Sequence, residues 1–237
     1  MILGFAVMGL FLGSLLNWAG DYLPRFASNR AAFPSAARPA SAVWQRLMSF
    51  ASRKSRPSFP TSSWLSVAVE LVTAVFFAYL GQRLGWSWKL LYLVVACSFF
   101  LLIAIIDLKY RLVLNVLVYP AAALALLLHS LPPGRDTLAA LLGGAVGLSP
   151  FLLAALLKPD GIGGGDVKLT ALIGLWVGFP HVLWALTLGI LAGAVTTLGL
   201  LLTRRWNLTS HIPYAPFLCL GMVLSLLGVP FFFVLRI

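Results

Sequence analysis

Two aspartates are the residues in this chain that point most directly to chemistry. Asp166 closes the glycine-rich run 161–166 and is followed at once by apolar sequence, and Asp107 ends the apolar run 97–106. The chain holds only six acidic residues. An ionisable group next to an apolar segment of membrane length is costly to keep there, which makes it a candidate for function. Two such aspartates predict a paired-carboxylate site.

Paired carboxyl groups can hydrolyse a peptide bond by general acid–base catalysis. Held within hydrogen-bonding reach, they do not both ionise easily, so one keeps a proton while the other stays charged. The charged group takes a proton from water, and the protonated group polarises the scissile carbonyl. This aspartic chemistry needs neither a metal nor a covalent nucleophile. We therefore expect no cofactor for proteolysis and no metal site.

The elements that must position these aspartates are transmembrane helices. Of the 237 residues, 61% are hydrophobic and 10% are charged, which is typical of an all-α polytopic membrane protein. The net charge of +11 lies in the loops, where Lys and Arg set topology and touch anionic lipid, so no nucleic acid partner is expected. Apolar runs of about bilayer length predict about eight helices. They cover residues 2–19, 64–84, 88–106, 112–131, 138–157, 168–179, 181–202 and 214–234.

The runs divide the chain into three parts. Residues 1–19 are expected to form a first transmembrane helix, retained because it lacks the basic start of a signal peptide. Residues 20–63 form a basic cytoplasmic loop, and residues 64–237 form the transmembrane peptidase domain. The loop is too poor in apolar residues for its own core. A short interfacial helix at 41–51 and a basic linker are both compatible with its composition.

The basic residues predict an orientation. Lys and Arg are far more frequent in cytoplasmic loops than in external ones. One side of the predicted topology holds Arg25, Arg30, Arg38, Arg46, Arg53, Lys54, Arg56, Lys109, Arg111, Lys158, Lys168, Arg204 and Arg205, and the other holds Arg83, Lys89, Arg135 and Arg236. The first side, which includes both aspartates, is therefore expected to face the cytoplasm.

The sixth predicted helix is unusually short. Residues 168–179 would make about 18 Å of helix at 1.5 Å per residue, against about 30 Å of hydrocarbon. Asp166 would then lie below the membrane surface, in a cavity. Gly163 and Gly165 form a supporting loop there, since irregular backbone at membrane depth requires surrounding protein or water. Lys168 points away from Asp166 on a helix and is expected to meet phospholipid or an acidic group of the substrate.

The chain resembles the prepilin leader peptidases, the GxGD aspartic membrane proteases that process type IV prepilins and type II secretion pseudopilins. The resemblance rests on several motifs along the chain. They are Gly13 to Asn17, Leu23-Pro24, Val69-Glu70-Leu71, Ile106-Asp107-Leu108 with Asn115 and Pro120, Gly163 to Lys168, and Ile212 to Phe217, where Ala215 stands in place of the usual glycine.

This resemblance implies a function. Asp107 and Asp166 match the family's catalytic pair. Members cut a short basic leader after a glycine, at the cytoplasmic face of the bacterial inner membrane, and many also methylate the new N-terminus with S-adenosylmethionine. Many relatives bind zinc through two CxxC pairs in the first loop. That loop has no cysteine here, so no zinc is expected and methylation is left open.

Alternatives remain at this stage. Glu70 is a candidate substrate or cofactor contact, or equally a buried partner for Asn17, which itself is more often a link between helices. Asp21 falls in a predicted loop and is expected to be solvated. A proton-coupled transporter or channel could also use two aspartates, although no internal repeat supports it. A third reading is an inactive membrane scaffold that binds pilins.

Overall fold

The computed structural model describes residues 2–30, 63–131, 136–157, 163–202 and 214–228. Among these residues the regular secondary structure is entirely helical, which confirms the predicted all-α polytopic fold. The helices are α1 (Ile2–Arg30), α3 (Ser63–Leu84), α4 (Trp88–Tyr110), α5 (Asn115–Ser130), α6 (Thr137–Leu157), α7 (Gly164–Val177), α8 (His181–Leu202) and α9 (Ala215–Leu226).

Helix lengths divide the described helices into two groups. Five of them, α1, α3, α4, α6 and α8, are long and apolar enough to cross a membrane. The apolar helices α5 and α9 are shorter. Helix α7 has 14 residues, which gives about 21 Å at 1.5 Å per residue. The short α7 agrees with the sequence prediction for this segment.

Helix α1 differs from the prediction at its end. It continues past residue 19 to Arg30 and contains Pro24. Asp21 is therefore helical, so its expected place in a loop is wrong. Its side chain is 41% exposed and so stays partly solvated, and its Oδ1 accepts a hydrogen bond from Lys109 Nζ of α4 at 2.9 Å. The extended α1 reaches the end of α4, which brings these two charges together. The rest of the expected basic loop, with its interfacial segment 41–51, lies outside the described residues, and the three-part division of the chain stays a prediction.

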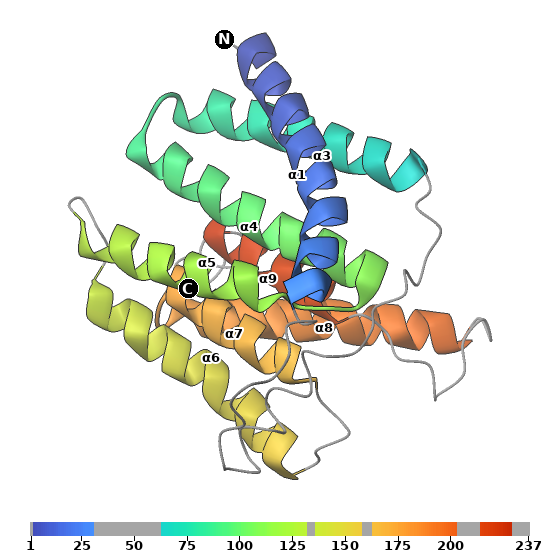
Figure 1. Cartoon of the computed structure of the whole chain (residues 1–237). Coiled ribbons are helices and arrows are strands. Elements are labelled where there is room, and N and C mark those ends of the chain that lie inside the picture. The colour runs from blue at the N-terminus through green and yellow to red at the C-terminus, as the bar shows by residue number, and fades with distance from the viewer. Residues whose placement is uncertain (1, 31–62, 132–135, 158–162, 203–213, 229–237) are drawn as a thin grey trace.

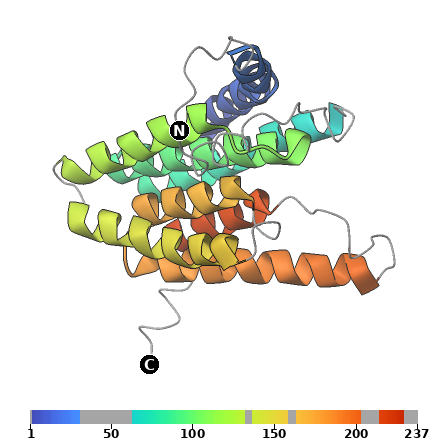
Figure 2. The ribbon, with the colours of Figure 1, turned by 60° about the horizontal axis from the view of Figure 1, so that its bottom comes forward.

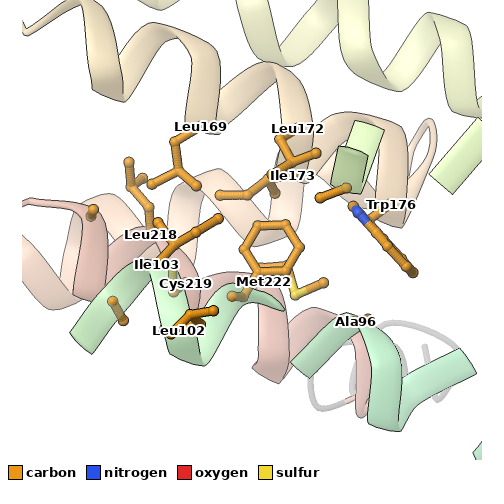
Figure 3. Packing of buried hydrophobic residues seen from close by; sticks show 14 of the residues in the cluster. Ala96, Leu102, Ile103, Leu169, Leu172, Ile173, Trp176, Leu218, Cys219 and Met222 are labelled. Carbon is orange, nitrogen blue, oxygen red and sulfur yellow. The ribbon is translucent and has the colours of Figure 1, made fainter. Parts of the chain in front are cut away.

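Helix α7 lies at the centre of the bundle. It packs most extensively on α6 and also contacts α5, α8 and α9. Figures 1 and 2 both show α1 at one side of the bundle, where it packs against α3 and α4. Side chains from α7, α4 and α9 meet in the core, as Figure 3 shows. Those that are fully buried include Leu169, Leu172, Ile173, Trp176, Ile103, Leu218 and Met222.

Glycines bring the backbones of α6 and α7 into direct contact. A Cβ added at Gly174 would collide with the carbonyl oxygen of Gly143, and one added at Gly143 would collide with the carbonyl oxygen of Gly174. Gly147 faces the Thr170 carbonyl oxygen in the same way, and Gly221 of α9 meets a backbone carbonyl of α8. Small residues are how membrane helices gain close packing, because lipid provides no hydrophobic driving force between them. The position of α7 is therefore fixed by backbone contact.

Candidate active site

Asp107 lies in the last turn of α4 and is buried, with 6% of its surface exposed. The helix ends just beyond it at Arg111, whose φ of 53° is left-handed and whose backbone N–H donates to the Asp107 carbonyl at 2.8 Å. Such a residue ends a helix and redirects the chain. Within the described residues the Asp107 Oδ2 has no hydrogen-bond partner. A buried acceptor without a partner is costly, so this oxygen is available for a proton, water or substrate.

Asp166 lies in the first turn of α7 and is half-buried. The sequence placed it on an irregular glycine loop before a helix beginning at residue 168, and this boundary is wrong. Helix α7 begins at Gly164 because Gly163, with φ −68° and ψ 137°, is its N-cap and accepts the Asp166 backbone N–H at 3.0 Å. The first turn of a helix carries partial positive charge, which favours an ionised carboxylate.

The two aspartates lie within electrostatic reach of each other. The end of α4 and the start of α7 therefore bring together residues that are far apart in the sequence. The start of α9 adds two neighbours: a backbone hydrogen bond joins Ala215 to Asp107, and Tyr214 lies within electrostatic reach of Asp166. Neither residue was assigned a role from the sequence. Their only signal was their place in the motif 212–217.

The supporting residues around Asp166 contact the connection between α4 and α5 and the first residue of α5. Lys168 Nζ donates to the Asn115 Oδ1 at 3.0 Å, so this lysine meets a residue of the protein where the sequence suggested phospholipid or a substrate group. A Cβ added at Gly165 would lie 3.0 Å from the Val113 Cβ, which marks close packing. Gly163 is exposed, and a Cβ added to it would lie 3.6 Å from the Asp166 Oδ2.

Asn17 and Glu70 join α1 to α3. The Asn17 Nδ2 donates to the Ser66 carbonyl oxygen at 2.9 Å and to the Glu70 Oε1 at 3.3 Å. Asn17 is 7% exposed, and within the described part of the chain its Oδ1 has no partner. The pair thus links two helices, as one of the two readings held, and the Asn17 Oδ1 is a buried acceptor without a described partner.

No group of three or more His, Cys, Asp or Glu that could hold a metal occurs among the described residues. Cys97 and Cys219 are buried in α4 and α9. The expectation of no zinc stays a prediction, because residues 31–62 of the first loop are not described.

The absence of a side chain at Gly163 should leave the Asp166 carboxyl group accessible. A Cβ here would lie 3.6 Å from the Asp166 Oδ2, an ordinary contact, so Gly163→Ala is expected to remain active. A larger side chain would cover the carboxyl group, so Gly163→Leu should lower peptidase activity by about 10²-fold, the loss associated with small misplacements of reacting groups. Initial cleavage rates of the two variants decide the matter, and equal rates for both would contradict this role of Gly163.

Together these observations define a polytopic helical membrane protein whose candidate site pairs two aspartates at helix ends. The sequence profile of the type IV leader peptidase family matches residues 93–198, which include both aspartates. The chain is 32% identical over 230 residues to the prepilin leader peptidase/N-methyltransferase of Bacillus subtilis (strain 168), covering 93% of this chain and 92% of that protein. The protein of the same name from Pseudomonas aeruginosa is 31% identical over 166 residues, covering 67% of this chain and 57% of that protein.

No solved structure matches the chain. The chain belongs to the type IV leader peptidase family and is a protease. The transporter alternative finds no support among these relatives, whose names are those of peptidases.

Proposed function

We propose that this protein removes the leader peptide from type IV prepilins or type II secretion pseudopilins, using a water molecule activated between Asp107 and Asp166. The observation that carries the mechanism is the pairing of a buried carboxyl group that has an unpartnered oxygen with a second carboxyl group within electrostatic reach. Two carboxyl groups of this kind share one proton, so that the protonated group can act as the acid and the ionised group as the base.

The helix ends supply an asymmetry between the two groups. Asp166 lies in the first turn of α7, where the helix dipole favours its ionised form, and it is less buried than Asp107. Asp107 is buried in the last turn of α4, where the dipole disfavours a negative charge. We therefore assign the proton to Asp107, which polarises the scissile carbonyl, and the general base to Asp166, which takes a proton from water.

The direct test uses purified protein in detergent and a synthetic peptide that covers the leader and the start of the apolar segment of a type IV prepilin. Cleavage at the leader junction is expected, and it should continue in a strong chelator because the aspartate chemistry requires no metal. A zinc site needs about four Cys or His ligands, and the first loop contains neither residue. Failure to cut the peptide would overturn the proposed function. A tightly bound metal whose removal stops cleavage would overturn only the metal-free mechanism.

Methylation of the new N-terminus is a second candidate activity, supported by the names of the relatives. S-adenosylmethionine would supply the methyl group when bound. Asn17 and Glu70 fit a polar ligand of this kind, since the Asn17 Oδ1 is a buried acceptor without a described partner and Glu70 provides a half-buried carboxylate. We propose this pair as the contact for the substrate or the cofactor.

Mass spectrometry of the cleaved prepilin, made with wild type and Glu70→Gln, should show a methylated N-terminus for wild type alone. Methylation by both proteins would exclude Glu70.

The proposed location is the bacterial inner membrane, with the site at the cytoplasmic face and lipids and prepilin N-terminal segments as partners. The excess of basic residues on the side of both aspartates supports this orientation. A cysteine introduced at Ser41, in a background lacking Cys97 and Cys219, should resist a membrane-impermeant thiol reagent in intact cells and react after lysis. Labelling in intact cells would show that the loop faces outward and would contradict the proposed orientation.

A further inference from the structure

The connection between α4 and α5 contacts the part of α7 that carries Asp166. It starts at Arg111, four residues after Asp107, and α5 starts at Asn115. Two contacts of residues 113–115, which cover the end of the connection and the first residue of α5, reach α7. One is the packing of Val113 against Gly165, and the other is the hydrogen bond from Lys168 to Asn115. The residues contacted flank Asp166 on both sides, so one short segment links the backbone near Asp107 to the backbone near Asp166.

The Asn115 side chain is placed for this contact and not for capping its own helix. Asparagine is among the strongest N-cap residues. Here the N-cap of α5 is Leu114, which makes no side-chain cap, and Asn115 follows as the first helical residue. Its Oδ1 instead accepts from Lys168 Nζ at 3.0 Å, across 53 residues of sequence. The amide thus serves an interaction between helices.

The choice of partner is also unusual in electrostatic terms. The start of a helix carries partial positive charge, so an ammonium group at the first residue of α5 is disfavoured by the dipole. Helix stability alone would therefore not select a lysine at this place. Both side chains are half-buried, where a hydrogen bond from a charged donor is stronger than one between neutral groups. We therefore interpret the hydrogen bond as one that holds the first turn of α7 in place against the start of α5.

The second contact limits sliding along the same interface. A Cβ on Gly165 would lie 3.0 Å from the Val113 Cβ and 3.1 Å from its Cγ2, closer than nearly all real side-chain contacts. The first turn of α7 is therefore held against the connection by close packing at Gly165 and by the hydrogen bond at Lys168. Asp166 lies between these two points.

We propose that Asn115 and Lys168 are positioning residues for the peptidase reaction: their hydrogen bond holds the first turn of α7 so that Asp166 stays in place opposite Asp107. This inference rests on the proposed function, since it assigns the pair a role through the two aspartates. Neither residue takes part in bond breaking. Loss of the contact should therefore reduce turnover more than substrate binding.

The test compares Asn115→Leu, Lys168→Met, the double variant and Asn115→Asp in cleavage of the same prepilin peptide by purified protein. Asn115→Leu and Lys168→Met should each lower kcat by about 10²-fold, the loss expected from a displacement near 1 Å, with KM changed by less than about threefold. The double variant should lose no more than the worse single variant, because both remove one interaction. Asn115→Asp should keep kcat within about tenfold of wild type, because a carboxylate oxygen also accepts from an ammonium.

Tyr92→Phe is the matched control for stability. It removes the hydrogen bond from the Tyr92 hydroxyl to the Trp176 carbonyl oxygen, at the other end of α7. We expect it to lower Tm in detergent about as much as Asn115→Leu does while leaving kcat near wild type. A similar loss of kcat in Tyr92→Phe would show that Asn115 acts only through stability and would overturn the proposal.

Other results would also overturn it. Wild-type kcat in Asn115→Leu would exclude a positioning role. Losses that multiply in the double variant, or a loss confined to KM in Lys168→Met, would show that Lys168 contacts substrate directly. If Asn115→Asp were as impaired as Asn115→Leu, the hydrogen bond from Lys168 to residue 115 would not be the cause of the loss of kcat. The proposed function is judged separately by Asp166→Asn, whose activity would refute the aspartate mechanism whatever Asn115 does.

Discussion

Asp107→Asn and Asp166→Asn are each expected to abolish prepilin cleavage while the protein remains inserted at wild-type abundance. Asparagine keeps the shape of the side chain, but it can neither take a proton from water nor donate an acidic proton to the scissile carbonyl. General acid–base catalysis contributes about 10² to 10⁴-fold, so the barrier should rise by about 3 to 5 kcal/mol. Leader removal followed on a gel, in cells and with purified protein, measures the effect.

Asp136→Asn is the matched control for this experiment. Asp136 is exposed, and its Oδ1 accepts the Leu138 backbone N–H at 2.9 Å at the start of α6. Asparagine can accept the same hydrogen bond, so this variant should cleave at the wild-type rate. Near wild-type processing by either Asp107→Asn or Asp166→Asn would refute the paired-aspartate mechanism.

Gly174→Ala should strongly destabilise the protein although it adds a single methyl group. The new Cβ would collide with the Gly143 carbonyl oxygen, and a backbone atom cannot move aside as a flexible side chain does. Overpacking of this kind costs about 1 to 3 kcal/mol and sometimes more. A lower Tm in detergent and a lower yield of folded protein are the expected results.

Gly4→Ala in α1 is the control, since a Cβ there meets nothing within 4 Å. Alanine is a better helix former than glycine by up to about 1 kcal/mol, so this change should be neutral or slightly stabilising. Equal Tm values for Gly174→Ala and Gly4→Ala would contradict backbone contact between α6 and α7.

The sequence predicts the helices of this protein well, and their ends less well. Long apolar runs can satisfy their backbone groups in lipid only as helices, so composition alone indicates most of the fold. Helix ends depend on local caps. The glycines before Asp166 suggested a loop, whereas Gly164 and Gly165 enter the first turn of α7, and Asp21 is carried into α1 by a helix that continues to Arg30.

The candidate site was only partly predictable for a related reason. Asp107 and Asp166 are visible because charge is rare in apolar sequence. The contact between Asn115 and Lys168 has no such signal, since it depends on how two helices pack and joins residues 53 positions apart. The same holds for Ala215, which meets Asp107 through its backbone, a group that every residue carries.

The shortness of α7 has a consequence for how the reactants meet. With 14 residues, it cannot span the hydrocarbon layer in a straight line, so under the proposed orientation we expect the end that bears Asp166 to lie below the membrane surface, where water must reach it through the protein. Under the proposed orientation, water enters from the cytosol while the apolar segment of the prepilin arrives by diffusion within the bilayer. The relevant substrate concentration is then a number of molecules per unit of membrane area. Cleavage rates should scale with the peptide-to-lipid ratio of the vesicle and not with the peptide content of the bulk solution.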